Sequence, residues 1–271
     1  MTKNDPSTSV SPATKSGTQV IQRVAALLRG ISLRNRVGAR LIDLCDEIDI
    51  ERPTAHRILQ GLVSEGLVRQ DEANKRYYLG SAIYEMGLTA SPRTNIRDLC
   101  HPYLQQIAQQ TGDTVFLTTR AGFDGVCIDR AEGAFPIKVF VLDVGRRRPL
   151  NVGGGALAIM GFLDDDEMNR ILKVNQDRCV EKYPNYSESA ARKTILRARS
   201  KGFVVSDSIE LSGVRTIAVP IFDRNNQPIA AISVSTVVQR MDKSRSEMVL
   251  SCITSAIERI QPNLFKLDAE D

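Results

Sequence analysis

Residues 52–60 carry side chains of the kinds that read the edges of DNA bases. Arginine and glutamine can form paired hydrogen bonds to guanine and adenine in the major groove, and threonine can add a single one. Thr54, Arg57 and Gln60 recur every three residues, so one face of a helix would present them together. The residues of this helix expected on DNA are Arg52, Pro53, Thr54, His56, Arg57 and Gln60.

The other side of the same helix is apolar, as packing against a core requires. Apolar residues follow helical spacing at Ala55, Ile58, Leu59, Leu62 and Val63. Pro53 suits the first helical position because its missing N–H would be unpaired there, and Gly66 suits the position after the last turn. A helix with a basic outer face is often only a solvated helix, so the neighbouring elements must decide between the two interpretations.

Those neighbours predict a winged helix-turn-helix. Apolar stripes at residues 19–31 and 41–48 predict two helices before residue 53, and residues 67–69 and 75–79 predict two short strands around a polar turn. In such a fold the second helix of the pair enters the major groove, while the wing reaches backbone or minor groove. Lys75 and Arg76 on the wing are therefore expected to contact phosphates. Winged helices also serve as protein-interaction modules that do not read DNA, and this alternative stays open.

A second candidate site begins at Gly153-Gly154-Gly155, where a helix is expected to start. Unpaired N–H groups at a helix N-terminus carry the positive end of the dipole and can bind a carboxylate or phosphate. Glycines equally permit a tight turn and close packing, so both interpretations stay open. Polar side chains expected near the loop are Asp207, Thr216, Ser233 and Ser235. Amide donors on one side and hydroxyls on another suit a small organic acid.

Residues 95–262 predict an α+β domain with a largely antiparallel sheet. Strands are expected at residues 114–119, 125–130, 136–143, 203–208, 215–222 and 228–237. Helices are expected from residue 95 to about 112, after the glycines, and at residues 164–174, 187–201 and 243–260. Around this domain we expect a disordered tail at residues 1–16, the winged domain at 17–80, a linker helix at 81–94 and an acidic tail at 263–271.

Composition excludes several classes of protein. With 271 residues and 42% apolar content, the chain can bury a sizeable core in two domains. Five scattered cysteines suit free thiols in a reducing cytosol, and two histidines exclude a His-rich metal centre. No segment approaches 18 uninterrupted apolar residues and no secretory leader is present, so we expect a cytoplasmic protein that needs no membrane and no cofactor. No nucleophile stands beside a base, so an enzyme is not expected.

The chain resembles the IclR family of bacterial transcriptional regulators over nearly all of residues 17–260. The motifs that carry this resemblance are residues 48–68, 77–80, 145–150, 213–223 and 230–235. The resemblance implies a winged-helix DNA-binding domain, a linker helix and a GAF-like effector-binding domain. It also implies assembly into dimers or tetramers that repress or activate catabolic operons.

The family's effector site falls on a defined set of residues in this sequence. The resemblance implies that the ligand's carboxylate lies at Gly154, Gly155 and Ala156, and that the lining strands contribute Ser206, Asp207, Thr216, Ser233 and Ser235. Family members often have a lysine where this chain has Leu157 and a cysteine where it has Thr216. Losing a positive charge at Leu157 suggests an effector larger or less acidic than glyoxylate or pyruvate, aromatic acids included.

These observations predict a sequence-specific regulator that binds operator DNA and a small organic acid. We expect a repressor of a catabolic operon, acting as a homodimer or tetramer, with an activator of the same class as the alternative. The first 80 residues hold 12 Lys and Arg against 9 Asp and Glu. This excess is modest, so strong binding to phosphates would need the two basic faces of a symmetric dimer.

Overall fold

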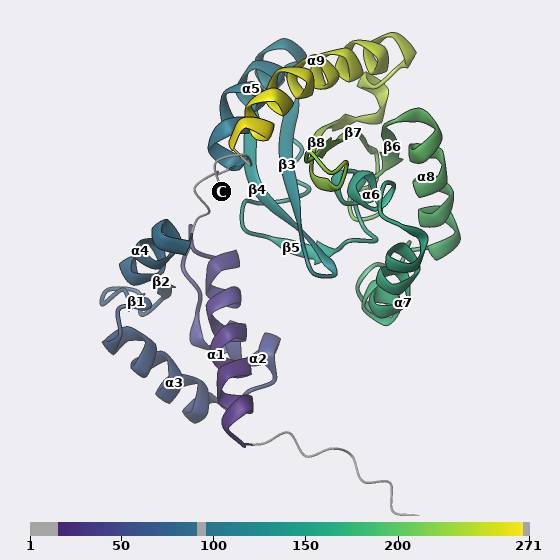
Figure 1. Cartoon of the computed structure of the whole chain (residues 1–271). Coiled ribbons are helices and arrows are strands. Elements are labelled where there is room, and N and C mark those ends of the chain that lie inside the picture. The colour runs from purple at the N-terminus through teal and green to yellow at the C-terminus, as the bar shows by residue number, and fades with distance from the viewer. Residues whose placement is uncertain (1–15, 91–95, 268–271) are drawn as a thin grey trace, which may run out of the picture. The chain divides into compact units, whose positions relative to one another are not determined.

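The chain divides into two compact units, residues 1–90 and residues 91–271. The structure is a computed structural model, and it describes residues 16–90 and 96–267 (Figure 1). The remaining residues of the expected linker and of both expected tails lie outside these ranges. Within the described part, no helix is both long and apolar enough to cross a membrane.

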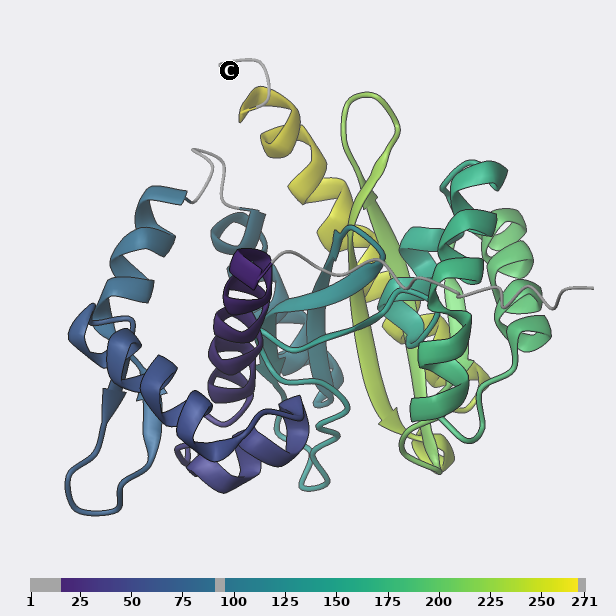
Figure 2. The same cartoon turned by 90° about the horizontal axis from the view of Figure 1, so that it is seen from below.

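The first unit is a winged helix-turn-helix, as the sequence predicts. Its elements are α1 (Ser16–Leu33), α2 (Leu41–Ile48), α3 (Arg52–Ser64), β1 (Val68–Gln70), β2 (Tyr77–Leu79) and α4 (Ser81–Ala90). Strands β1 and β2 pair antiparallel, with Arg69 opposite Tyr78. Figure 2 shows this hairpin projecting from the helices of the unit.

The core of this unit fixes the angle at which α3 presents its outer face. Leu59 on α3 is fully buried and packs in one cluster with Leu27 of α1, Leu44 of α2 and Tyr77 of β2. The turn between α2 and α3 passes through Asp49, whose φ of 52° is left-handed, and asparagine and aspartate tolerate that region better than most residues. Pro53 lies in the first turn of α3, and Gly66 follows the helix with a φ of +68°.

The second unit contains a six-stranded sheet in the order β5-β4-β3-β8-β7-β6. The strands are β3 (Thr114–Ala121), β4 (Asp124–Glu132), β5 (Arg147–Pro149), β6 (Val204–Asp207), β7 (Val214–Phe222) and β8 (Pro228–Val237). Each pairing among these strands is antiparallel, which confirms the predicted sheet type. The central pair joins distant parts of the sequence, with Thr114 opposite Ser235.

Helices cover both faces of this sheet, and a separate hydrophobic cluster lies under each layer (Figure 1). One layer holds α5 (Ile96–Thr111) and α9 (Lys243–Leu267); the other holds α6 (Gly154–Met160), α7 (Asp165–Lys182) and α8 (Glu188–Lys201). Alternation along β8 assigns residues to the two layers: Ile232 packs in the cluster of α5 and α9, and Ala231 in that of α6 to α8. The small Ala231 side chain lets α6 lie close to the sheet.

The strand predicted at residues 136–143 is wrong. Val139, Val141 and Leu142 are buried against Phe116 of β3, but their backbone forms no ladder. Alternating burial produces a strand-like sequence pattern whether or not the backbone pairs. The place beside β4 is taken instead by β5, in which Arg148 lies opposite Gly125.

Two helices continue beyond their predicted ends. Helix α7 runs to Lys182 rather than to residue 174 because buried Asn175 and Cys179 extend the inner face from Ile171 at intervals of four. The polar Asn175 concealed this periodicity in the sequence. Helix α9 runs through Pro262 to Leu267, and the buried Leu264 continues its inner face. The helix therefore extends into the segment expected to be an acidic tail.

Buried thiols predict a loss of stability at alkaline pH. Burial raises the pKa of Cys100 and of Cys127 from 9 to about 12. A raised pKa means that the folded state holds the proton more tightly, so this stabilisation is complete below pH 9 and is lost as the pH rises towards 12. We expect the free energy of unfolding to fall by about 1 kcal/mol for each thiol between pH 8 and pH 10, as measured by urea denaturation at both pH values.

The control for this prediction is the double variant Cys100→Ala/Cys127→Ala, which lacks both titrating thiols. Its free energy of unfolding should fall less steeply over the same pH interval. An equal fall in both proteins would show that other groups cause the alkaline destabilisation.

Candidate DNA-binding surface and effector cavity

The outer face of α3 presents the side chains that the sequence assigned to DNA. Arg52, His56, Arg57 and Gln60 are exposed, and Thr54 is half-buried. These residues lie on the side of α3 away from its buried residues. Because Leu59 packs into the core, the opposite side of the helix faces outward. The structure therefore brings together the predicted residues of α3 on one surface of the unit.

Arg57 lies in the middle of this face and is free to bind a base. Within residues 16–90 its guanidinium has no ion-pair or hydrogen-bond partner, so its five N–H donors are available. Gln60 differs because its side chain lies near the Tyr77 hydroxyl and influences the pKa of that residue. Burial raises the pKa of Tyr77, and the interaction with Gln60 opposes the rise. Gln60 thus faces the wing, whereas Arg57 has no such neighbour in the hydrogen bonds and ion pairs of residues 16–90.

The two basic residues predicted on the wing have different environments. Lys75 is exposed and adopts a φ of 57° at the turn. Arg76 donates hydrogen bonds from Nη1 to the carbonyl oxygens of Val37 and Gly38, each at 3.1 Å. Lys75 can therefore reach a phosphate directly, while the guanidinium of Arg76 fastens the wing to the segment before α2.

Sequence reasoning missed one further cation on the wing. Arg69 is exposed on β1, and its guanidinium carbon lies 4.1 Å from the centre of the Tyr78 ring on β2. Such stacking holds an arginine in place without using its hydrogen-bond donors. Alternation was the available signal, because the buried Val68 next to it directs Arg69 outward.

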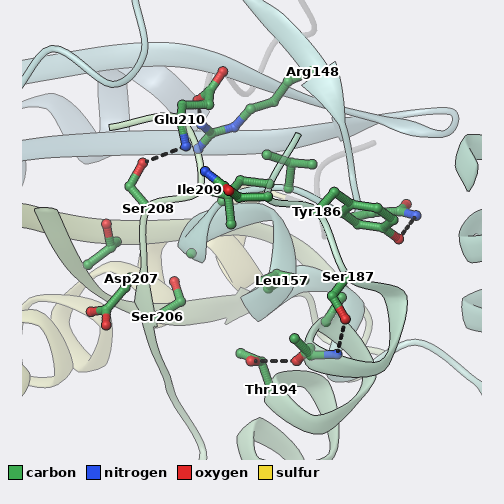
Figure 3. A pocket seen from close by; sticks show the side chains of 18 of the residues that line it. Arg148, Leu157, Tyr186, Ser187, Thr194, Ser206, Asp207, Ser208, Ile209 and Glu210 are labelled. Carbon is green, nitrogen blue, oxygen red and sulfur yellow. Dashed lines mark hydrogen bonds and ion pairs between the residues drawn. The ribbon is translucent and has the colours of Figure 1, made fainter. Parts of the chain in front are cut away.

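The second unit contains a cavity of about 220 Å³ between the start of α6, helix α8 and the segment that follows β6. Figure 3 shows Arg148 and Glu210 at one end and Ser187 and Thr194 at the other, with Leu157 and Tyr186 between them. The lining combines apolar side chains, such as Val141, Leu157 and Ile209, with a larger number of polar ones. Small-molecule sites use such polar groups to fix the orientation of a ligand.

The predicted effector residues divide between this cavity and a smaller space beside it. Gly154, Ser206, Asp207 and Thr216 line the cavity. The smaller space, about 10 Å³ and large enough for one water molecule, is lined by Gly155, Ser233 and Ser235 together with Gly154 and Thr216. A hydrogen bond of 2.8 Å joins the hydroxyls of Thr216 and Ser235 and closes this inner end.

Two of the predicted residues are placed differently from the others. Ala156 lines neither space; it is buried in the core under α6, beside Gly125 of β4. Asp207 lies at the edge of the cavity, its side chain is 61% exposed, and Arg215 binds both of its carboxylate oxygens. Thr216 and Ser206, whose residues are buried or half-buried, are the better polar contacts for a ligand.

Close packing explains all three glycines of the loop. A Cβ atom on Gly153, whose φ is +90°, would overlap the guanidinium of Arg148. A Cβ on Gly154 would lie 2.6 Å from Thr216 Cγ2, and one on Gly155 would lie 2.9 Å from Thr118 Oγ1. The packing interpretation is therefore sufficient to require glycine at each position, whether or not the amides also bind an anion.

Arg148 lines this cavity although it is not among the residues predicted there, as is also true of Tyr186 and Glu210. It is buried, it lines both spaces, and its Nη1 donates to Glu210 Oε2 at 2.8 Å. The available signal was its place in the run Arg146-Arg147-Arg148-Pro149-Leu150, where the strand alternates and only one arginine of a pair can face inward. Arg148 supplies a positive charge on the cavity wall, which Leu157 does not.

Buried amides fix the wall opposite the sheet. Asn175 Nδ2 donates to Asn151 Oδ1 at 3.0 Å, and Asn151 Nδ2 donates to the Tyr186 hydroxyl at 3.0 Å. Burial raises the pKa of Tyr186, so the hydroxyl keeps its proton. Because Tyr186 lines the cavity while its hydroxyl is held from behind, it presents a fixed aromatic face to a ligand.

Comparison with known families agrees with this arrangement of domains. Residues 20–72 match the IclR helix-turn-helix domain, and residues 89–261 match the C-terminal domain of the bacterial transcriptional regulator IclR. The chain belongs to the IclR family. Membership confirms the predicted regulator with a DNA-binding helix-turn-helix domain and an effector-binding C-terminal domain, and its relatives are named transcriptional regulators rather than enzymes.

This IclR-family regulator is similar to two proteins of Escherichia coli strain K12 along most of their length. It is 27% identical to the HTH-type transcriptional regulator XynR over 225 residues, which are 82% of this chain and 89% of XynR. It is 23% identical to the transcriptional repressor IclR over 242 residues, which are 89% of this chain and 87% of that protein.

Solved structures of IclR proteins share the fold of this regulator. The IclR transcriptional regulator of Alicyclobacillus acidocaldarius superposes with a TM-score of 0.74 at 21% identity, covering 90% of this chain and 98% of that one. An IclR homologue of Microbacterium hydrocarbonoxydans, solved in complex with 4-hydroxybenzoate, gives a TM-score of 0.72 at 19% identity over the same shares of the two chains.

Proposed function

We propose that this regulator represses its target genes, that α3 reads the operator, and that the cavity of the second unit binds a small carboxylic acid. The observation that carries the proposal is the buried Arg148 guanidinium on the wall of a cavity in the effector-binding domain. Arg148 is the one cation among the described lining residues, and a single hydrogen bond joins it to Glu210. A guanidinium can give two parallel hydrogen bonds to a carboxylate, so an acidic ligand is the class that can compete for this residue. Repression is supported by the relatives that are named as repressors.

On the DNA side, we propose that Arg57 binds a base edge and that Thr54, His56 and Arg52 support it from the same face. The wing contributes Lys75 and Arg69 towards the backbone. Replacing Arg57 with alanine is expected to weaken operator binding by about 1–3 kcal/mol and to relax specificity at one base pair. Fluorescence anisotropy with DNA upstream of the protein's own gene, in the presence of excess unrelated DNA, measures both effects.

The matched control is Arg76→Ala, because the Arg76 guanidinium binds backbone carbonyls rather than facing outward. That variant should lower the stability of the wing while specificity at each base pair is retained. If Arg57→Ala left affinity and specificity unchanged, the assignment of α3 as the reading helix would be wrong. The result would then favour the winged unit as a protein-interaction module.

We further propose that the regulator binds its operator as a homodimer or as a pair of dimers. On helix α4, Tyr84 is 69% exposed and Leu88 is 60% exposed. The two lie four residues apart and so share one face of the helix, and neighbouring exposed apolar side chains mark an interaction surface. A second copy also supplies the second basic face that the modest net charge requires. Sedimentation of the full chain measures this state, and a monomer on DNA would contradict the proposal.

The size and lining of the cavity favour an effector with one ring or a short chain. Its volume of about 220 Å³ is below the range of drug-sized sites. Tyr186 and Leu157 offer apolar contact to a ring, Arg148 faces the carboxylate end, and Thr194 lies at the opposite end (Figure 3). The structural relative that was solved with 4-hydroxybenzoate carries a ligand of this chemistry.

Replacing Arg148 with methionine is expected to weaken binding of an aromatic acid by about 1.5–3 kcal/mol, the contribution of a hydrogen bond to a charged group. Thermal shift and calorimetry with benzoate and 4-hydroxybenzoate measure the loss. Arg147→Met is the matched control: Arg147 is the next residue on β5, it faces outward, and it pairs with Asp124 at the surface. Equal affinity of Arg148→Met and the wild type for every acid tested would contradict the role of Arg148.

If an acid releases this repressor from its operator, acid binding must lower the affinity of the protein for DNA. The effector must bind the DNA-free state more tightly, and typical coupling free energies are about 1–3 kcal/mol. The anisotropy titration, repeated with each acid that stabilises the protein, should show weaker operator binding. Tighter binding in the presence of the acid would instead identify an activator or a co-repressor mechanism.

A further inference from the structure

One ion pair forms part of the wall of the cavity. Arg148 on β5 and Glu210 in the connection between β6 and β7 meet at 2.8 Å, with side chains that are 10% and 19% exposed. Both line the cavity, and Figure 3 shows them together at one end of it. The position facing the Arg148 guanidinium is therefore already occupied by a carboxylate of the protein itself.

The charges around the cavity do not allow two carboxylates there at once. Among the described lining residues, Arg148 is the single cation, while Asp207 and Glu210 are acidic. Arg215 pairs with Asp207 at the surface. Arg148 is therefore the residue that can neutralise an acidic group at the other end of the cavity. A ligand carboxylate placed beside an unmoved Glu210 would meet a like charge in a partly buried space, which disfavours the charged forms.

The contact between these two side chains is of a kind that can be exchanged. A single hydrogen bond, from Arg148 Nη1 to Glu210 Oε2, joins them, whereas a guanidinium can give two parallel bonds to a well-placed carboxylate. Glu210 belongs to an irregular segment, residues 208–213. A local turn holds that segment, in which the amides of Glu210 and Leu211 donate to Ser208 Oγ at 3.3 and 3.1 Å.

We propose that Glu210 stands in for the carboxylate of the effector, and that an acidic effector binds Arg148 by displacing Glu210 into solvent. This inference rests on the proposed function of the cavity, and it adds that Glu210 competes with the effector for Arg148. The effector is then a carboxylic acid, and one ligand carboxylate takes the place of the Glu210 carboxylate. Binding is also expected to release residues 208–213 from the wall.

The test replaces Glu210 with glutamine, which keeps the shape and a neutral hydrogen bond but removes the competing charge. Thermal shift and calorimetry on the full chain use benzoate, 4-hydroxybenzoate, phenylacetate and the corresponding amides as probes. We expect at least one acid to bind Glu210→Gln about tenfold or more tightly than it binds the wild type. The amides should bind both proteins equally. Glu188→Gln, which removes an acid paired with Arg192 on α8 outside the cavity lining, should leave the affinity of the acid unchanged.

Each outcome separates this inference from the function on which it rests. An acid that binds the wild type at least as tightly as Glu210→Gln would overturn the exchange and leave the acid-binding cavity intact. Failure of every acid to bind either protein would overturn the cavity's proposed function and the exchange together. If Glu188→Gln also bound the acid tenfold more tightly, the loss of any nearby negative charge would explain the gain in affinity. That result would also overturn the exchange.

A measurement on the wild type keeps the inference testable if the variant folds poorly. Amide hydrogen exchange of residues 208–213, followed by mass spectrometry with and without the bound acid, should become faster on binding because Glu210 no longer anchors the segment. Faster exchange confined to this segment supports the displacement. Slower exchange there would show that the ligand holds Glu210 in place, and the inference would be wrong.

Discussion

Replacing Asp113 with alanine is expected to lower the free energy of unfolding by about 3–5 kcal/mol, the cost of removing one partner from a buried ion pair. The Asp113 side chain is 1% exposed, at the junction of α5 and β3. Its Oδ1 accepts from Thr236 Oγ1 at 2.8 Å and from Arg240 Nε at 3.0 Å, and its Oδ2 accepts from Arg245 Nη2 at 2.9 Å. One carboxylate thus joins the start of β3 to the end of β8 and the start of α9.

Urea denaturation followed by circular dichroism measures this loss, since the chain has no tryptophan to report by fluorescence. Asp143→Ala is the matched control. Asp143 also pairs with an arginine, Arg130, at 2.7 Å, but it is 67% exposed, and exposed pairs contribute less than about 1 kcal/mol. Similar losses in the two variants would show that burial does not determine the strength of the Asp113 cluster.

Truncating Leu59 to alanine is expected to lower the free energy of unfolding of the winged unit by about 2–5 kcal/mol, the usual cost of a cavity in a packed core. Leu59 is fully buried on the inner face of α3 and contacts the cluster shared by α1, α2 and β2. A small domain has little stability to spare. We therefore expect faster amide exchange throughout α3 and a loss of operator binding, although Leu59 does not face the DNA.

Leu33→Ala is the control for this truncation, because Leu33 lies on α1 of the same unit and is 47% exposed. The same atoms are removed, yet the change should stay within about 0.5 kcal/mol. Hydrogen exchange of α3 amides and anisotropy with operator DNA distinguish the two variants. Normal DNA affinity in a Leu59→Ala protein with rapidly exchanging α3 amides would contradict the link between this core and recognition.

The winged unit could be predicted almost completely from the sequence because its signals are local. The apolar spacing around Leu59, the proline at the first turn and the glycine after the last turn each act within one helix. The same spacing directs Arg57 outward. Arg76 shows the limit of this reasoning, since its partners, the carbonyls of Val37 and Gly38, lie far from it in the sequence.

The sheet of the second unit was predictable where neighbouring strands share a clear alternation, and unpredictable at its edge. Val139 and Val141 alternate because one side of their segment is buried, and no local signal shows that this backbone lacks a partner strand. The predicted end of helix α7 at residue 174 is too early because Asn175 is a polar residue. In the structure its amide is satisfied by the carbonyl of Phe123 and by Asn151, so it can continue the buried face.

The cavity could be predicted only in part, because its lining comes from segments that are distant in sequence. The hydroxyls of Thr216 and Ser235 were found from strand alternation, and their hydrogen bond follows from the register that places them opposite each other. Arg148 was missed because a run of three arginines is typical of a solvated surface. Only the fold shows that one of them turns inward to Gly153 and Glu210.

The order of strands in the large sheet determines when each half of the protein can form during synthesis. Strands β1 and β2 lie within the first 79 residues, whereas the central strand β3 must wait for β8, because Thr114 pairs with Ser235. Pairing across so long a separation in sequence is slow, and domains generally fold as the chain emerges. A nascent chain therefore completes its DNA-binding unit first. Translation that ends between these two points would yield a polypeptide with both strands of the wing but without β8, and so without the complete sheet beside the cavity.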